Sequence, residues 1–151
     1  MRVYIQLFII CLLFGAGSCL KPNSGMTIYK NEGFIVDIPT DLKVRKECPV
    51  EDFELHSFVI DTTTILTVYV GNQPSFPSCD VKGVSEMQGE INGYAVRCVS
   101  SESQGKYTRE VLFDFSKIHD WPQYLHFSYA YLPLDDARIA DQIIDSVRTA
   151  K

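Results

Sequence analysis

Histidine and cysteine are the residues of this sequence best suited to catalysis or metal binding, and their spacing decides whether they can act together. The three histidines, His56, His119 and His126, show no pair at the i, i+2 or i, i+4 spacing of a local metal site. The sequence has no C-x-x-C pair and no G-x-S-x-G motif. Catalysis needs a nucleophile with a base, or a metal with several ligands. The sequence therefore indicates a protein that is not an enzyme and has no cofactor, with a zinc site assembled across strands as the alternative.

Two other patterns contain residue types found in phosphate-binding or catalytic sites, but the surrounding sequence does not fit such a site. The segment "SQGKYT" (103–108) contains a Gly-Lys-Tyr-Thr run, but it lacks the upstream glycine and the following helix of a phosphate-binding loop. Asp135 and Asp136 could form an acid/base couple. They directly follow Pro133 and Leu134 at the start of a predicted helix, where capping is their more common role.

The N-terminus has the pattern of an export signal. Arg2 precedes an apolar stretch over residues 3–14, which is shorter than the roughly 20 apolar residues of a membrane-spanning helix. Small residues at 15–18 suit a signal peptidase. We expect residues 1–18 to be a signal peptide that is removed before Cys19.

The segment "AGSC" (16–19) resembles a bacterial lipobox. That resemblance implies a thioether lipid on Cys19 and acylation, with palmitate for example, so that the protein is held at a membrane surface. The alternative is an ordinary secretory signal with an incidental cysteine. Leu20 is not the aspartate that, in enteric lipoproteins, implies retention at the inner membrane. The resemblance therefore implies a lipoprotein of the bacterial cell envelope, at the outer membrane and facing the periplasm.

Length and charge restrict the rest of the chain. Removal of the first 18 of 151 residues leaves 133, enough for one domain: we expect a polar tether over 19–27 and a single domain over 28–151. The net charge of −5 becomes −6 when Arg2 is removed. A negative charge of this size disfavours nucleic acid and anionic lipid as partners and favours a basic protein.

Short β-rich segments dominate the domain, and one helix ends it. The predicted strands lie in 33–39, 52–61, 63–71, 84–101, 107–115 and 124–133, with turns near Thr62 and Thr63 and at Asn92-Gly93. The segment 134–151 predicts an amphipathic helix. Its apolar stripe consists of Ala140, Ile143, Ile144 and Val147, with Arg148 and Lys151 at its C-terminal end.

The opening "GFIVDIP" (33–39), the antiparallel strands and the closing "IADQIIDSV" (139–147) resemble the PsbP-like superfamily. That resemblance implies an α+β fold, an α/β/α-type sandwich with a curved antiparallel β-sheet and a C-terminal amphipathic helix. Its members include photosystem extrinsic subunits, envelope lipoproteins and chaperones for secreted effectors. The resemblance therefore implies binding to a protein partner without catalysis.

Three cysteines belong to the predicted domain. We expect a Cys48–Cys79 disulfide to close the hairpin that turns near Thr62, and Cys98 to be a small buried residue within a strand. The alternatives are a Cys79–Cys98 disulfide and an intermolecular bond, because spacing does not fix connectivity.

Two aromatic residues in proline-containing loops are the candidate partner-binding residues. Phe76 lies between Pro74 and Pro77, and Trp121 precedes Pro122. A stiff loop loses little entropy on binding, and tryptophan is common among interface hot spots. The alternative is that each ring folds back onto the edge of the sheet.

The functional hypothesis is an envelope lipoprotein that binds a protein. One specific form is an immunity protein that neutralises a secreted antibacterial toxin by occluding it, because such lipoproteins are short, exported and acidic. The alternative is a structural or assembly accessory of an envelope complex. A small-ligand carrier or hydrolase is a minor alternative.

Overall fold

The structure is a computed structural model that describes residues 25–50, 52–78 and 84–150, with the backbone alone for residues 48–50. Strands dominate it, in agreement with the β-branched and aromatic composition of these segments. The elements are β1 (Met26–Lys30), β2 (Phe34–Pro39), β3 (Lys43–Val50), β4 (Phe53–Ile60), β5 (Thr63–Gly71), β6 (Met87–Ile91), β7 (Tyr94–Ser103), β8 (Lys106–Asp114), β9 (Tyr124–Pro133), α1 (Leu134–Asp145) and β10 (Arg148–Thr149).

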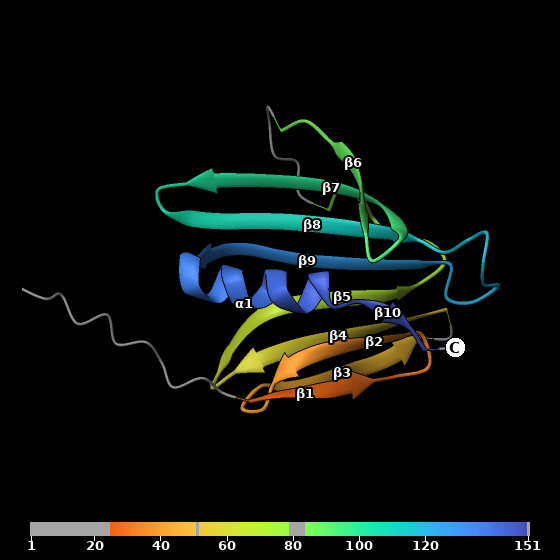
Figure 1. Ribbon diagram of the computed structural model, residues 1–151, viewed down its shortest axis with the longest axis horizontal. Coiled ribbons are helices and arrows are strands. Elements are labelled where there is room, and N and C mark those ends of the chain that lie inside the picture. The colour runs from red at the N-terminus through yellow and green to blue at the C-terminus, as the bar shows by residue number, and fades with distance from the viewer. Residues whose placement is uncertain (1–24, 51, 79–83, 151) are drawn as a thin grey trace, which may run out of the picture.

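The strands form two antiparallel sheets. A large sheet has seven strands in the order β3-β4-β5-β9-β8-β7-β6, and a small sheet has three in the order β1-β2-β10. The helix and the small sheet both lie on one face of the large sheet, α1 over β5, β8 and β9 and the small sheet over β3 and β4 (Figure 1). We call this face the core face.

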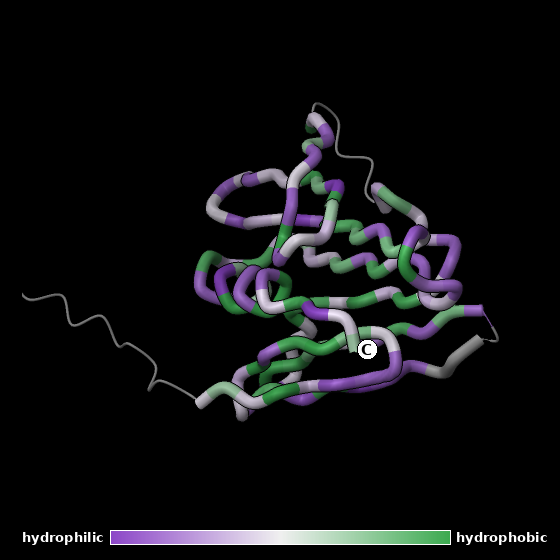
Figure 2. The backbone as a smooth tube through the Cα atoms, turned by 45° about the vertical axis from the view of Figure 1, so that its right-hand side comes forward, coloured by the Kyte–Doolittle hydropathy of each residue, from purple (hydrophilic) through white to green (hydrophobic). Residues whose placement is uncertain are grey.

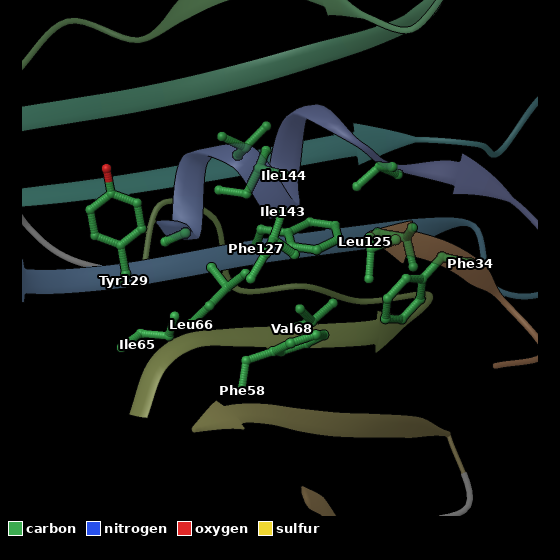
Figure 3. Packing of buried hydrophobic residues seen from close by; sticks show 14 of the residues in the cluster. Phe34, Phe58, Ile65, Leu66, Val68, Leu125, Phe127, Tyr129, Ile143 and Ile144 are labelled. Carbon is green, nitrogen blue, oxygen red and sulfur yellow. The ribbon is translucent and has the colours of Figure 1, made fainter. Parts of the chain in front are cut away.

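The core lies between these layers. Phe34 of the small sheet packs edge-on to Phe127 of β9, with ring centroids 5.8 Å apart. Figure 3 shows Ile143 and Ile144 of α1 directed at the same cluster. Every second residue of the central strands faces it, as the period of a β-strand requires, and Figure 2 shows the resulting alternation of hydropathy along the chain.

His56 ties the two sheets together on the core face. It is fully buried, its Nδ1 lies 2.9 Å from the hydroxyl of Tyr29 in the small sheet, and its Nε2 lies 3.0 Å from Glu54 Oε2. The amide Nδ2 of Asn31 is 3.2 Å from the same Nε2. Burial lowers the pKa of His56, against the opposing effect of Glu54. Both ring nitrogens therefore have partners within the fold.

Several sequence predictions are confirmed. The β4–β5 hairpin turns at Asp61, which has φ 55°, next to the predicted Thr62. Asn92 and Gly93, at φ 51° and 82°, make the predicted tight turn between β6 and β7. The mixed α+β class also holds, because one helix follows nine antiparallel strands in the described residues.

The expected α/β/α layering is not found. In the part of the chain that the structure describes, the single helix shares the core face with a second sheet, and no helix covers the other face. The segment 26–30 forms β1 and pairs with β2 on the core face, so the domain begins two residues before the predicted boundary between the tether (19–27) and the domain (28–151). The sequence pattern predicts neither this strand nor β3.

The predicted helix over 134–151 is too long. It ends at Asp145, where Asn92 Nδ2 donates hydrogen bonds to the carbonyl oxygens of Asp145 and Val147, at 2.6 and 3.1 Å. The following residues form β10 and pair with β2, so Arg148 binds Asp37 rather than acting at the helix end. A distant hairpin thus terminates the helix, which local periodicity does not reveal.

The predicted capping role of Asp135 and Asp136 is also wrong. Pro133 is the N-cap residue, with no side-chain cap, and both aspartates lie in the first turn of α1. There they still interact favourably with the positive end of the helix. The helix α1 has 12 residues. No helix in the described residues is long and apolar enough to cross a bilayer.

Candidate functional site: a cavity on the open face

The face of the large sheet opposite α1 carries a second set of alternating residues. We call it the open face. Its members in adjacent strands are in register: Leu55 pairs with Tyr69 and Tyr69 with His126, while Thr67 pairs with Ser128. These residues alternate with the core residues of β4, β5 and β9, so the strand period alone directs them away from the core.

A cavity of about 730 Å³ lies on this open face. Its floor is the central strands, and its walls are the start of β4, the segment after β5 and the segment before β9. A volume of this size is in the range of ligand-binding clefts. The lining residues are Asp52, Phe53, Leu55, Thr67, Tyr69, Asn72, Gln73, Ser75, Ser78, Trp121, His126 and Ser128.

Phe53 and Tyr69 form one aromatic wall. Their rings stack with centroids 5.4 Å apart and an interplanar angle of 22°. Gly71 makes this arrangement possible, because a Cβ there would lie 2.9 Å from Phe53 Cβ and 2.7 Å from the hydroxyl oxygen of Tyr69. The backbone N–H of Gln73 donates to that hydroxyl at 3.1 Å, which fixes the tyrosine against the strand.

Trp121 also lines the cavity, on a segment that contacts the rest of the fold at two places. The N–H of Gln123 donates to Asn72 Oδ1 at 3.0 Å, which joins this segment to the one after β5. On the core side, Pro122 packs on Gly33, where a Cβ would lie 2.9 Å from Pro122 Cγ. The two aromatic walls are therefore set by backbone contacts rather than by side-chain packing alone.

His126 and Glu110 form a buried pair beside the cavity. His126 Nε2 lies 2.8 Å from Glu110 Oε2, and the backbone N–H of Ser78 donates to the same oxygen at 2.8 Å. Burial lowers the pKa of His126, against the opposing charge of Glu110. The imidazole is therefore neutral near pH 7 and donates its Nε2 proton to the carboxylate, so Nδ1 is a hydrogen-bond acceptor.

A histidine–carboxylate pair is two parts of a catalytic triad, and a nucleophile is the third part. A base needs a hydroxyl or thiol within hydrogen-bond reach. Among residues 25–50, 52–78 and 84–150, His126 Nδ1 has no hydrogen bond to a serine or threonine hydroxyl. The described residues also contain no group of three or more His, Cys, Asp or Glu side chains placed to hold a metal ion.

The charged side chain that lines the cavity is negative. Among the described residues, Asp52 is exposed at its rim and is the single carboxylate of the lining, and no described lysine or arginine lines it. The other polar groups are hydroxyls, carboxamides and the neutral His126. The cavity thus offers acceptors and aromatic faces to a positively charged group.

The two predicted partner-binding aromatics have different surroundings. Trp121 is half-buried, packs against the core cluster and lines the cavity. Phe76 is also half-buried but does not line it: its ring lies edge-on to His126, with centroids 5.4 Å apart, and the guanidinium of Arg97 lies 5.0 Å from its centroid. Phe76 therefore caps the open face beside the cavity.

The predicted disulfide and lipid site lie outside the described residues. Cys19 and Cys79 are not described, and Cys48 is described by its backbone in β3 alone. Cys98 is a free cysteine, half-buried on the core face, so the alternative Cys79–Cys98 pairing is not formed.

The sequence analysis does not predict the residues that form the floor of the cavity. They alternate with core residues along their strands, and this alternation is the one sequence signal that indicates them. Their proximity depends on pairing of β5 with β9 across more than fifty residues of intervening chain, which neither strand's pattern encodes. His126 and Tyr69 are the clearest examples.

No family model matches this chain, and no curated protein matches it.

Proposed function

We propose that the protein is a lipid-anchored envelope protein that binds a protein partner through its open face. The observation that carries this proposal is the cavity of about 730 Å³, whose aromatic walls are held by Gly71 and by the Asn72–Gln123 hydrogen bond. A site whose groups are already in place loses little entropy on binding.

The position of the first strand is compatible with an anchor on Cys19. The chain enters the domain at β1, in the small sheet, which lies on the core face (Figure 1). The cavity is on the other side of the large sheet. A lipid on Cys19, followed by a tether that ends where β1 begins at Met26, would therefore leave the open face available to a partner.

We propose further that the fold is a PsbP-like variant. Two features support this: the opening strand 33–39 and the closing amphipathic helix, both packed on an antiparallel sheet. In this variant the small sheet lies beside α1 on the core face, and no helix of the described residues covers the open face.

The specific role that we propose is that of an immunity protein, which occludes a basic secreted toxin. The negative charge of the chain and the exposed Asp52, the one charged side chain among the described lining residues, support a basic partner. Capture of a component of an envelope machine would instead assign the protein an accessory role.

The test is affinity capture with the full chain, tagged at its C-terminus and produced in its own cells. The variants are Trp121→Ala and Phe76→Ala, and the matched control is Ile118→Ala, an apolar residue that is 60 % exposed on the same segment as Trp121. We expect at least tenfold less partner with Trp121→Ala and no change with Ile118→Ala. Equal recovery with all four proteins would contradict binding through the open face.

The role itself is tested by deletion. Loss of resistance to sibling cells that secrete a toxin, restored by the original chain and not by Trp121→Ala, would support immunity. Unchanged resistance would contradict it.

The anchor is tested separately by Cys19→Ser. We expect the original chain in the membrane fraction with a lipid mass on its N-terminal cysteine, and the variant in the soluble envelope fraction. An unmodified cysteine on the mature protein would overturn this part of the proposal.

A further inference from the structure

The residues that line the cavity on the open face indicate which chemical group of a protein partner binds there. We infer that it receives an arginine side chain from an extended segment of the partner, with the guanidinium against the aromatic lining residues and near Asp52. This inference rests on the proposed function, because it names the group through which the same site recognises its partner.

Charge complementarity is the first reason. Within residues 25–50, 52–78 and 84–150, Asp52 is the single carboxylate of the lining and no lysine or arginine lines the cavity, and the whole chain has a net charge of −5. His126 does not oppose a cation, because burial lowers its pKa and leaves it neutral near pH 7. The described lining residues therefore offer a positively charged group one direct attraction, from Asp52, and no like charge.

The aromatic walls are the second reason. A guanidinium is planar and weakly hydrated, and it stacks on aromatic faces as well as interacting with their π-electrons. Phe53 and Tyr69 present a stacked pair, and Trp121, the strongest cation–π partner among aromatic residues, lines the same cavity. A carboxylate ligand would gain nothing from these faces.

The hydrogen-bond groups are the third reason. Arginine carries five N–H donors and no acceptor, so it needs a site rich in acceptors. His126 Nδ1 is an acceptor with no hydrogen bond in the described part of the chain, and Thr67 and Ser128 add hydroxyl oxygens to the floor. Asp52 at the rim adds a carboxylate, which a guanidinium binds in a planar, two-bond geometry.

Size is the reason for an extended segment rather than a free small cation. The cavity of about 730 Å³ exceeds the volume of one arginine side chain, and it is bordered by the exposed Asn72, Gln73 and Ser75. These residues lie on irregular backbone after β5. They leave room for the residues on either side of the arginine.

The test uses Trp121 as an internal reporter. It is the one tryptophan of the chain, so it gives a single indole N–H signal in a nitrogen-labelled sample of the full chain with its lipid. The probes are N-acetyl-arginine amide and N-acetyl-citrulline amide, which have nearly the same shape, but the citrulline side chain is neutral and has a carbonyl oxygen in place of one NH2 group. We expect a saturable shift with the arginine probe and at least about fivefold weaker binding of the citrulline probe.

Two substitutions locate the charge. We expect Asp52→Asn to weaken binding of the arginine probe about fivefold, because the substitution removes the carboxylate at the rim of the cavity. Asp135→Asn is the matched control, since the Asp135 side chain is 93 % exposed on α1, away from the cavity. We expect it to bind within twofold of the original chain. We expect Tyr69→Leu, which removes one of the two stacked rings, to weaken binding of both probes.

Three results would overturn the inference: no saturable shift, equal binding of both probes, or equal effects of Asp52→Asn and Asp135→Asn. Each is distinguishable from failure of the proposed function. If Trp121→Ala abolishes partner capture while the arginine probe does not bind, the open face still binds the partner but through another group. If the probe binds and capture is unaffected by Trp121→Ala, the cavity is a cation site and the partner docks elsewhere.

Discussion

Each face of the large sheet buries one histidine beside one glutamate, yet the two pairs have different surroundings. On the core face, His56 has a partner at both ring nitrogens and lies edge-on to Tyr29 and Phe34. On the open face, His126 binds Glu110 through Nε2, and its other nitrogen has no partner in the described residues. Burial alone therefore does not distinguish a structural histidine from one at a binding site.

The layers above the two histidines explain this difference. Above His56 lies the small sheet, whose Tyr29 and Asn31 complete its hydrogen bonds. Above His126 lies the irregular segment after β5, which supplies Phe76 as a cap and leaves a cavity alongside. Regular structure closes the core face, and a loop leaves the open face accessible, as is usual for binding sites.

The largest expected effect is a difference in the free energy of unfolding between substitutions on the core face and on the open face. Phe127→Ala removes a fully buried ring that contacts Phe34 and Phe113, and we expect it to lower the free energy of unfolding by about 3–5 kcal/mol. Tyr69→Ala on the open face should cost about 1–2 kcal/mol, because that ring is half-exposed. Urea denaturation measures both. Equal losses would show that the open face is part of the core.

A smaller effect is expected at the support of Trp121. Gly33→Ala forces a Cβ to within 2.9 Å of Pro122 Cγ and 3.2 Å of Val70 Cγ1, which we expect to cost about 1–3 kcal/mol and to shift the Trp121 indole signal. Gly89→Ala is the control, because its Cβ would meet Val96 at an ordinary 3.8 Å. A Gly33→Ala protein with an unchanged Trp121 signal would contradict the proposed support.

The smallest effect is a dependence of stability on pH. Both His56 and His126 have a lowered pKa in the folded chain, so the unfolded chain binds protons more readily as the pH falls below about 6.5. Stability is complete above that pH and decreases below it, by at most about 1.4 kcal/mol per pH unit for each ring.

Substitution separates the two contributions to this pH dependence. His56→Gln and His126→Gln should each reduce the slope between pH 5 and 6.5. His56→Gln should also cost more stability at pH 8, because the hydroxyl of Tyr29 and the amide of Asn31 lose a buried partner. Thermal unfolding across this pH range measures both quantities. A larger loss at pH 8 for His126→Gln would reverse the assigned roles of the two histidines.

The sequence pattern predicts those parts of the fold that depend on local signals. The period of β4, β5, β8 and β9 and the Asn92-Gly93 turn are examples, and each appears in the structure at or near the predicted residues. The end of α1 was mislocated because the groups that terminate it belong to Asn92, more than fifty residues earlier. Local periodicity contains no information on such a contact.

The candidate site was predicted less well than the fold. Trp121 was identified because a single tryptophan before a proline is conspicuous, and it does line the cavity. Phe76 was identified in the same way, but its ring is used to cover His126. The floor depends on the pairing of β5 with β9, and β3 with its charged residues resembles a loop until it pairs with β4. Long-range pairing is the missing information in both cases.

Photo-crosslinking in cells tests most directly whether the open face is the binding face. A photoreactive amino acid placed at Gln73, exposed at the cavity, is compared with one at Gln142, exposed on α1. We predict a covalent adduct of one defined mass from Gln73, abolished by Trp121→Ala, and none from Gln142. An adduct from Gln142 alone, or equal adducts from both positions, would contradict the assignment of the open face as the binding surface.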